Sequence, residues 1–322
     1  WEYRMAEAGN KVVVILNGGS GSGQAETVRN QIEELFGDAG REVLTVVPAD
    51  GQAIDKAVDD AIASGAAAVV AGGGDGTVNA VASRLLDHDI PFGVIPLGTL
   101  NHFARDLKLP LEVEDAVGVI LAGRTVRVDV GQINHRTFLN NSSLGLYPAI
   151  VKLREQRPTK GLLKWAVAAG ATAKALRHNQ ILSVEVEHEG GLLTRETPVV
   201  FVGNNEYKMV GLAAGTRDSL SQGQLAVYVV NTVGRLAQLK LGFQVLLGTA
   251  ERANELDVIR TAAATIRSRR PSLHVSYDGE VETMTGPFKY RILPKALAVF
   301  VGEADSARPT LGPDVRGNIT RG

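Results

Sequence analysis

Cysteine is absent from the 322 residues of this chain. The absence excludes a disulfide framework, a thiolate metal site and a cysteine nucleophile, and it agrees with a reducing compartment. Long apolar runs are absent as well, because the stretch Trp165–Ala173 is bounded by two lysines and falls far short of the roughly 20 residues of a spanning helix. Residues 1–10 also lack the basic region and apolar core of a signal peptide. These absences predict a cytoplasmic protein.

An excess of charge of one sign is missing too. The chain has 34 basic and 35 acidic residues, so no overall field attracts nucleic acid or an anionic membrane, and we expect no nucleic-acid partner. The hydrophobic share of 44% and the charged share of 21% are typical of a globular protein. At this length, two domains are the default expectation.

The first third of the chain alternates apolar runs with helical patterns, which predicts βαβ units and a parallel sheet. The runs Val12–Leu16 and Ala67–Ala71 are continuously apolar, as strands covered on both faces are. The segments expected to form strands or helices are, in order, Lys11–Leu16, Gln24–Phe36, Glu42–Val47, Ala53–Ala63, Ala66–Ala71, Thr77–Leu86, Phe92–Ile95 and Asp115–Gly123.

Period-2 segments dominate the rest of the chain and predict mostly antiparallel β-structure. The clearest of them are Thr125–Val130, Ile181–His188, Val199–Gly203, Leu225–Val230 and Leu273–Tyr277. Two helical patterns interrupt this half, at Leu162–Arg177 and Arg235–Arg252. Their apolar faces either pack on a core, which is the favoured interpretation, or touch lipid. The tail 304–322 lacks an apolar period and is predicted to be disordered.

Three polar loops follow three of the expected parallel strands, and such sheets bind ligands at the carboxyl ends of their strands. The loops are Asn17–Gly23, Gly72–Thr77 and Pro96–Arg105. Glycines let backbone N–H groups approach an anion, and a following helix adds the positive end of its dipole. The first loop, taken alone, is also compatible with a flexible turn. Together the three loops predict a phosphate site, with Thr77 near the N-cap of a helix.

Asp75 stands inside the second loop and would repel a bare phosphate. Its position is explained if it holds the glycine turn by a hydrogen bond, or if it faces a divalent cation that bridges phosphate oxygens, such as Mg²⁺ carried by a nucleotide. The loop lacks the Gly-Lys-Ser/Thr of a Walker loop and the third glycine of the dinucleotide fingerprint. P-loop and dehydrogenase functions are therefore disfavoured.

Two motifs carry a resemblance to a known family. Gly73-Gly74-Asp75-Gly76-Thr77 with Asn79, followed by Pro96-Leu97-Gly98-Thr99 with Asn101 and Phe103-Ala104, resembles the diacylglycerol kinase catalytic family, which includes bacterial lipid kinases and sphingosine kinases. The resemblance extends from about Lys11 to about Val301.

The resemblance implies a fold and an activity. It implies an α/β N-terminal domain with a doubly wound parallel sheet that binds nucleotide, at residues 11–127. A mainly antiparallel β-sandwich domain for the lipid, at 128–303, and the tail 304–322 would follow. ATP and Mg²⁺ would meet a lipid hydroxyl in the cleft between the domains. A lipid substrate also implies peripheral membrane contact, and a homodimer stays open.

The resemblance also assigns roles to single residues. Glu280 would be the general base, with Asp278 supporting it, and Asp75 would reach Mg²⁺ through the nucleotide. Without the resemblance, Asp278-Gly279 is better read as a hairpin turn, and both interpretations can hold together. The positions assigned to the nucleotide are Asn17, Ser20, Gly72, Gly73, Gly74, Asp75, Gly76, Thr77, Val78, Asn79, Gly98, Thr99 and Asn101.

One stretch departs from the family pattern. Relatives often carry aspartates where Ser221–Leu225 stands and use them around a structural Mg²⁺, whereas here the nearest carboxylate is Asp218. That metal site is therefore lost, moved to Asp218 or made of backbone groups. Two other functions stay open: a kinase of a soluble metabolite, of the NAD kinase type, and a nucleotide- or lipid-binding module without turnover.

Overall fold

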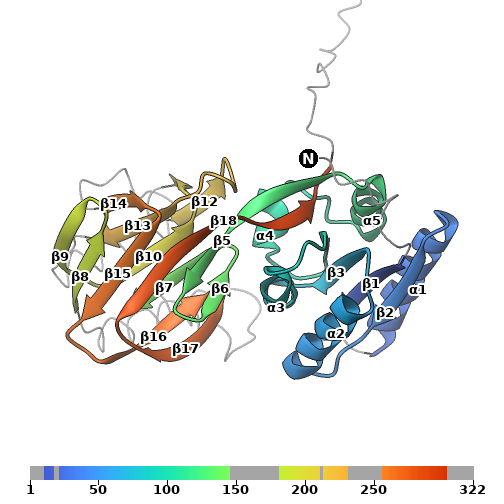
Figure 1. Ribbon diagram of the computed structural model, residues 1–322, viewed down its shortest axis with the longest axis horizontal. Helices are drawn as coiled ribbons and strands as arrows, with labels where there is room; N and C mark the ends of the chain where they lie inside the picture. Colours follow the sequence, from blue (N-terminus) through green and yellow to red (C-terminus); the bar gives the residue numbers. More distant parts are fainter. Residues whose placement is uncertain (1–10, 18–21, 146–180, 211–212, 231–255, 303–322) are drawn as a thin grey trace, which may run out of the picture.

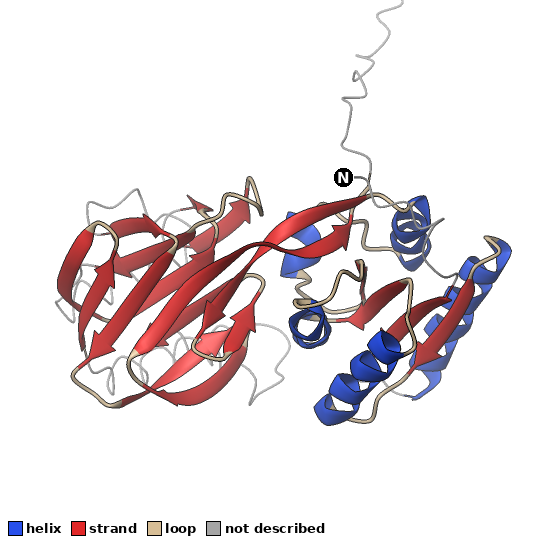
Figure 2. Ribbon diagram, in the orientation of Figure 1, coloured by secondary structure: helices blue, strands red, loops and turns tan. Residues whose placement is uncertain are grey.

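The computed structural model describes residues 11–17, 22–145, 181–210, 213–230 and 256–302. Figure 1 shows two lobes, the first formed by the start of the chain and the second by its middle and end. Two long strands, β5 (Thr125–Ile133) and β18 (Phe288–Phe300), run from one lobe into the other. The helices of the described part all belong to the first lobe or its border, as Figure 2 shows.

The first lobe is an α/β unit with a parallel sheet. Strands β2, β1, β3 and β4 lie in that order, and every pair among them is parallel. The strands are β1 (Lys11–Leu16), β2 (Glu42–Val46), β3 (Ala68–Gly73) and β4 (Phe92–Pro96). The helices are α1 (Ser22–Asp38), α2 (Gly51–Ala63), α3 (Asp75–Leu85), α4 (His102–Asp106) and α5 (Val113–Ala122). The prediction of a doubly wound parallel sheet is confirmed.

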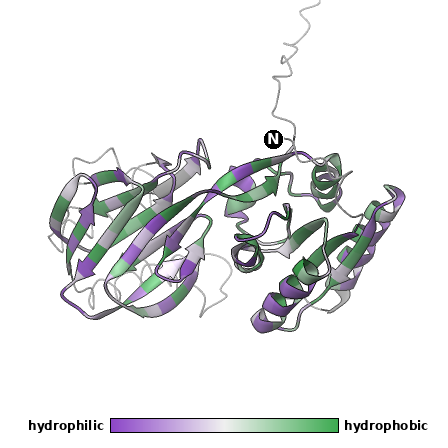
Figure 3. Cartoon of the chain, in the orientation of Figure 1, coloured by the Kyte–Doolittle hydropathy of each residue, from purple (hydrophilic) through white to green (hydrophobic). Residues whose placement is uncertain are grey.

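Alternate residues of the strands supply two separate cores, one on each face of the sheet. Val13 and Val69 pack toward α2 and α3, while Val12 and Val70 pack toward α1 and α5. Because both faces are covered, the strands are apolar throughout, and each fully buried side chain contributes about 1.5–3 kcal/mol. Figure 3 shows the matching pattern on α2, whose hydrophilic residues face away from the sheet.

The second lobe is a β-sandwich. Its inner core lies between the antiparallel part of the long mixed sheet and a second sheet with the order β14-β13-β10-β7-β16-β17. The remaining strands are β6 (Arg136–Phe138), β7 (Asn141–Gly145), β8 (Leu182–His188), β9 (Gly191–Thr197), β10 (Val199–Asn204), β11 (Tyr207–Val210), β12 (Ala213–Arg217), β13 (Leu225–Val230), β14 (Leu256–Thr261), β15 (Ala263–Ser268), β16 (Ser272–Tyr277) and β17 (Glu280–Thr285). The prediction of a mainly antiparallel second half is confirmed.

Strand β18 makes the two lobes share one sheet. Near its start it pairs with β15 of the sandwich, and near its end Val299 pairs in parallel with Phe92 of β4. Its partner β5 accompanies it with an irregularity in register between Leu293 and Leu297. The predicted domain limit between residues 127 and 128 lies within β5. The predicted domain limits therefore stay a prediction. The sheet that the two lobes share connects them directly.

Several expectations fall on other parts of the chain. The helical patterns Leu162–Arg177 and Arg235–Arg252 and the tail 304–322 lie outside the described residues. Within the described ranges, none of the helices has the length and apolar character that crossing a bilayer requires.

Candidate active site

The three polar loops meet at the carboxyl edge of the parallel sheet. The backbone N–H of Asn17 donates to the carbonyl of Gly72 at 2.8 Å, and the N–H of Leu97 donates to the carbonyl of Gly73 at 3.0 Å. The first and third loops therefore attach to the end of β3 on its two sides. Ser20 of the first loop lies outside the described residues.

The second loop is a tight passage from strand to helix. Gly72 and Gly73 are the last residues of β3, Gly74 is the N-cap of α3, and Asp75 is its first residue. Thr77 therefore lies within the first turn of α3, whereas the sequence placed it near the N-cap. With no side-chain cap on Gly74, the first N–H groups of α3 stay available to an anion.

Glycine at position 98 allows the second and third loops to touch. A Cβ atom added to Gly98 would lie 2.5 Å from the Cα of Gly74 and 2.7 Å from the Asn101 side-chain oxygen. Asn101 adopts a left-handed backbone (φ 50°) and exchanges two hydrogen bonds with Gly98, one from its amide to the Gly98 carbonyl and one from the Gly98 N–H. The contact leaves the backbone of both loops close together with no side chain between them.

Other predicted nucleotide contacts differ in what they can reach. The Asn17 amide donates to Thr77 Oγ1 at 2.9 Å, so these two side chains support each other. Val78 packs into the core, and its N–H donates to the Gly74 carbonyl within the helix. Asn79 is buried and faces the Thr137 carbonyl of β6. Thr99 is exposed at the tip of the third loop. Asn17 and Thr99 are the exposed residues among them, whereas Thr77, Val78 and Asn79 are buried.

Asp75 ties the second loop to the third. Its Oδ1 accepts a hydrogen bond of 2.8 Å from the backbone N–H of His102, at the start of α4. The carboxylate therefore holds a neighbouring loop rather than its own glycine turn. No hydrogen bond to the other oxygen occurs within the described residues, so that oxygen is available to a ligand.

Asp278 and Gly279 form the two-residue turn that joins β16 to β17, in which Tyr277 pairs with Glu280. Both turn residues have positive φ, 46° and 93°, as a type I′ hairpin requires. The turn also has a second role, because the Asp278 carboxylate accepts three backbone N–H groups. The distances are 2.6 Å to Leu139, 2.8 Å to Asn140 and 3.1 Å to Asn141. The hairpin prediction is confirmed, and the supporting role of Asp278 beside the general base stays a prediction.

The Asp278 carboxyl group has an unusual proton affinity. Burial raises its pKa from the ordinary 3.8 to about 6, and this effect exceeds the lowering by the three N–H donors and by Arg217. The group is therefore half-way between its charged and neutral forms at mildly acidic pH.

Glu280 begins β17 and reaches the second loop across the gap between the lobes. Its Oε1 lies 4.0 Å from the position of a Cβ atom added to Gly76, one residue beyond Asp75. The side chain is exposed, so a ligand can enter beside it. Glu280 and the predicted phosphate loop, which are far apart in the sequence, are therefore brought together, and Asp278 lies two residues before Glu280.

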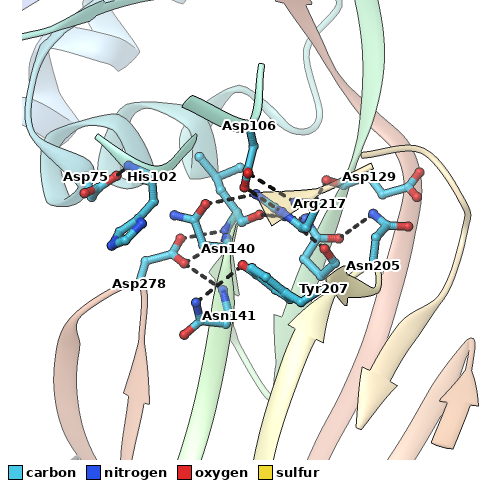
Figure 4. A network of polar contacts seen from close by, with 12 residues as sticks. Asp75, His102, Asp106, Asp129, Asn140, Asn141, Asn205, Tyr207, Arg217 and Asp278 are labelled. Carbon is cyan, nitrogen blue, oxygen red and sulfur yellow. Dashed lines mark hydrogen bonds and ion pairs between the residues drawn. The ribbon is translucent and has the colours of Figure 1, made fainter. Parts of the chain in front are cut away.

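A buried ionic network next to this turn was missed by the sequence reasoning. Arg217 of β12 pairs with Asp106 of α4 at 2.7 Å, and the two side chains are 0% and 7% exposed. The guanidinium also donates to the Asn140 side chain at 3.0 Å. Figure 4 shows Asp106, Arg217, Asn140 and Asp278 as neighbours in one set of polar contacts. No pattern in the sequence distinguishes this arginine from the other charged residues.

The stretch Ser221–Leu225, which departs from the family pattern, is fixed by hydrogen bonds to side chains of the protein. Asp129 accepts the N–H of Gly223 at 2.6 Å and that of Lys295 at 2.8 Å. Asn205 accepts the N–H of Gln222 at 3.0 Å. Asp218, the alternative metal ligand, pairs with Lys208 on the surface at 2.6 Å. The described part of the chain contains no group of three or more His, Cys, Asp or Glu residues placed to hold a metal ion.

Replacing Asp278 with asparagine tests its buried hydrogen bonds. The Asn side chain would turn an NH₂ group toward the N–H of Leu139, and we expect a loss of about 1–3 kcal/mol in the free energy of unfolding. Because the pKa of Asp278 is raised in the folded state, its stabilising contribution is complete below pH 3.8 and falls as the pH rises through about 6. The stability gap between wild type and Asp278→Asn therefore narrows on going from about pH 5 to about pH 7.

Urea unfolding at the two pH values measures this gap. A gap that widens with pH would show that the N–H donors, and not burial, dominate the pKa of Asp278.

Two family models match successive parts of the chain. Residues 11–133 match the family described as the diacylglycerol kinase catalytic domain, and residues 149–301 match the YegS C-terminal NAD kinase beta sandwich-like domain. Residues 11–133 therefore match a diacylglycerol kinase catalytic domain, as the two sequence motifs predicted. The glycine-rich loop and the whole of β5 lie within the first match, and the turn at Asp278 lies within the second.

Individual relatives are similar to parts of the chain. A "Probable lipid kinase YegS-like" from Yersinia enterocolitica is 32% identical over 155 residues, which cover 47% of this chain and 51% of that protein. A diacylglycerol kinase from Staphylococcus aureus is 29% identical over 220 residues, 66% of this chain and 67% of that protein. The chain spans about half the length of the two YegS-type relatives that it matches.

Solved structures show the same fold. A crystal structure described as a diacylglycerol kinase from Bacillus anthracis superposes with a TM-score of 0.68. The sequence identity is 22%, and the match covers 91% of this chain and 97% of that one. The two-lobed fold is therefore shared by a protein of low sequence identity.

Proposed function

We propose that this protein is an ATP-dependent lipid kinase, which transfers the γ-phosphate of ATP to a hydroxyl group of a lipid such as diacylglycerol. The observation that carries the proposal is the position of the Glu280 carboxylate against Gly76, at the start of the glycine-flanked helix α3. Phosphoryl transfer needs an anion site and a nearby base for the attacking hydroxyl, and these two features supply both.

The roles of the residues follow from their places. The N–H groups at the start of α3 point toward a phosphate, and the close contact of Gly74 with Gly98 lets backbone from two loops line it. Glu280 accepts the proton of the acceptor hydroxyl as the oxygen attacks the γ-phosphorus. The bond from that phosphorus to the β,γ-bridging oxygen breaks, and ADP leaves with the electron pair.

Mg²⁺ fits this site only as part of the nucleotide complex. Mg²⁺ is usually held by one or two carboxylates together with phosphate oxygens and water, and Asp75 supplies one carboxylate beside the phosphate site. When bound, the ion would neutralise charge on the phosphates. The donor set of the described residues fits such a shared ion and does not form an all-protein cage.

A lipid acceptor also implies contact with a membrane surface. We propose that the protein works at the cytoplasmic face of a membrane, which it touches peripherally, in phospholipid metabolism. The names of its relatives support a lipid substrate for those proteins. Sedimentation with phospholipid vesicles tests the contact, and light scattering tests whether the protein is a homodimer.

A radiolabelled ATP assay tests the proposed reaction. We expect Mg²⁺-dependent transfer of label to at least one lipid of a panel containing diacylglycerol, phosphatidylglycerol, sphingoid bases and isoprenoid alcohols. NAD is included as a soluble acceptor. Labelled NADP without labelled lipid would favour the soluble-metabolite kinase, and ATP binding without any labelled product would favour a module without turnover.

A further inference from the structure

The Arg217 side chain is the centre, or hub, of a buried hydrogen-bond network. A guanidinium has five N–H donors, and this one makes four hydrogen bonds and a further ion-pair contact. Nε and Nη2 bind Asp106, and Nη2 also binds Asn140 Oδ1. Nη1 donates to the carbonyls of Leu139 at 2.7 Å and Asn204 at 2.9 Å. The Tyr207 ring lies 5.3 Å from the guanidinium carbon. Burying such a charge is tolerable because it is paired with a carboxylate and hydrogen-bonded to its neighbours.

Arg217 and Asp278 both form hydrogen bonds with the same short segment, Leu139 and Asn140. The Leu139 carbonyl accepts from Arg217, while the Leu139 N–H donates to Asp278. Asn140 repeats the arrangement, since its side chain accepts from Arg217 and its N–H donates to Asp278. Leu139 and Asn140 each contact both side chains. A shift of the guanidinium would therefore be passed on to the turn at Asp278 by one intervening residue.

The other side of the hub leads to the phosphate site. Asp106 is the last residue of α4, and the first residue of α4, His102, donates its N–H to Asp75. Glu280 closes the path, because it follows Asp278 by two residues and lies against Gly76, the neighbour of Asp75. These contacts form a closed chain, or ring, that passes through both lobes. Arg217 lies on one side of the ring, and the contact between Glu280 and Gly76 lies on the other.

We propose that Arg217 is a positioning residue that sets the distance between Glu280 and the phosphate loop. The inference rests on the proposed kinase function. The guanidinium makes no hydrogen bond to any of the three nucleotide loops within the described residues. It therefore acts through Asp106 on one side and through Leu139, Asn140 and Asp278 on the other. Its loss should slow the transfer step and leave nucleotide binding nearly unchanged, because the three nucleotide loops keep their own contacts.

The variant Arg217→Lys keeps the charge and removes the fork of donors. We expect kcat to fall by about tenfold to a hundredfold, as a misplacement of about 1 Å would cause, with a KM for ATP within about threefold of wild type. The matched control is Arg195→Lys, at an exposed ion pair with Asp257 in the second lobe. All rates are measured well below the melting temperature of each variant.

A second readout does not depend on turnover. The chain has 0 cysteines, so the pair Gly76→Cys with Glu280→Cys reports the distance between the two positions without background. We expect the disulfide between them to form at least about threefold more slowly when Arg217→Lys is added, because the ring is loosened. Arg195→Lys should leave the rate unchanged.

The outcomes separate the two proposals. A wild-type protein that labels no lipid overturns the kinase function, and the cysteine pair still tests the ring. An active wild type with an equally active Arg217→Lys, or a loss confined to the KM for ATP, overturns the role of Arg217. If Arg217→Lys does not fold, Asn140→Ala removes one acceptor of the hub and is judged by the same kcat, KM and disulfide criteria.

Discussion

Replacing Glu280 with glutamine is expected to lower kcat for lipid phosphorylation by about 10²- to 10⁴-fold, the usual contribution of a positioned general base. Glutamine has nearly the same size and cannot take the proton of the attacking hydroxyl. The side chain is exposed and makes no hydrogen bond within the described residues, so the fold should not change. The affinity for ATP, measured by titration calorimetry, should stay that of the wild type.

Glu282→Gln is the matched control for this experiment. Glu282 lies on the same strand two residues later, and its carboxylate accepts from Arg136 at 2.9 Å and from the Tyr277 hydroxyl at 3.0 Å. Its exposed ion pair is worth at most about 1 kcal/mol, so we expect a change of less than about fivefold in kcat. Full activity in Glu280→Gln would show that Glu280 is not the general base. Equal losses of kcat in both variants would show that the total negative charge of β17 matters and not the position of Glu280.

Replacing Gly98 with alanine is expected to have the largest effect on nucleotide binding. The added methyl group would stand 2.5 Å from the Gly74 Cα. Because this neighbour is a backbone atom, it cannot move away as the end of a flexible side chain would. We expect a loss of about 1–3 kcal/mol in the free energy of unfolding and at least about a tenfold loss of ATP affinity, since the two loops are forced apart. Thermal unfolding and calorimetric titration with ATP measure the two effects.

Gly118→Ala adds the same methyl group where nothing lies within 4 Å of it. Gly118 is an exposed residue inside α5, so this control should gain about 0.5–1 kcal/mol of stability and bind ATP normally. Wild-type ATP affinity in Gly98→Ala would show that the contact between the second and third loops does not shape the nucleotide site.

The sequence by itself determined the first lobe and the edge at which its loops gather. Continuous apolar runs such as Val12–Leu16 are sufficient to identify buried parallel strands, and the bounds of β1 agree with that run to one residue. Parallel strands that follow one another through helices all end at one edge, so the loops after β1, β3 and β4 had to meet. Asp75 was therefore correctly placed at a shared edge, although its partner, the His102 N–H, was not foreseen.

Only the tertiary structure decided how the second lobe completes the site. From the sequence, the turn at Asp278 is an ordinary hairpin, because a local pattern carries no information on what lies across from it. The three N–H donors belong to Leu139, Asn140 and Asn141, which precede Asp278 by 137 to 139 positions. Arg217 and Asp106 are likewise 111 residues apart. Their burial depends on the long strands β5 and β18, which place both lobes on one sheet, and pairings over such distances are set by packing of the whole chain.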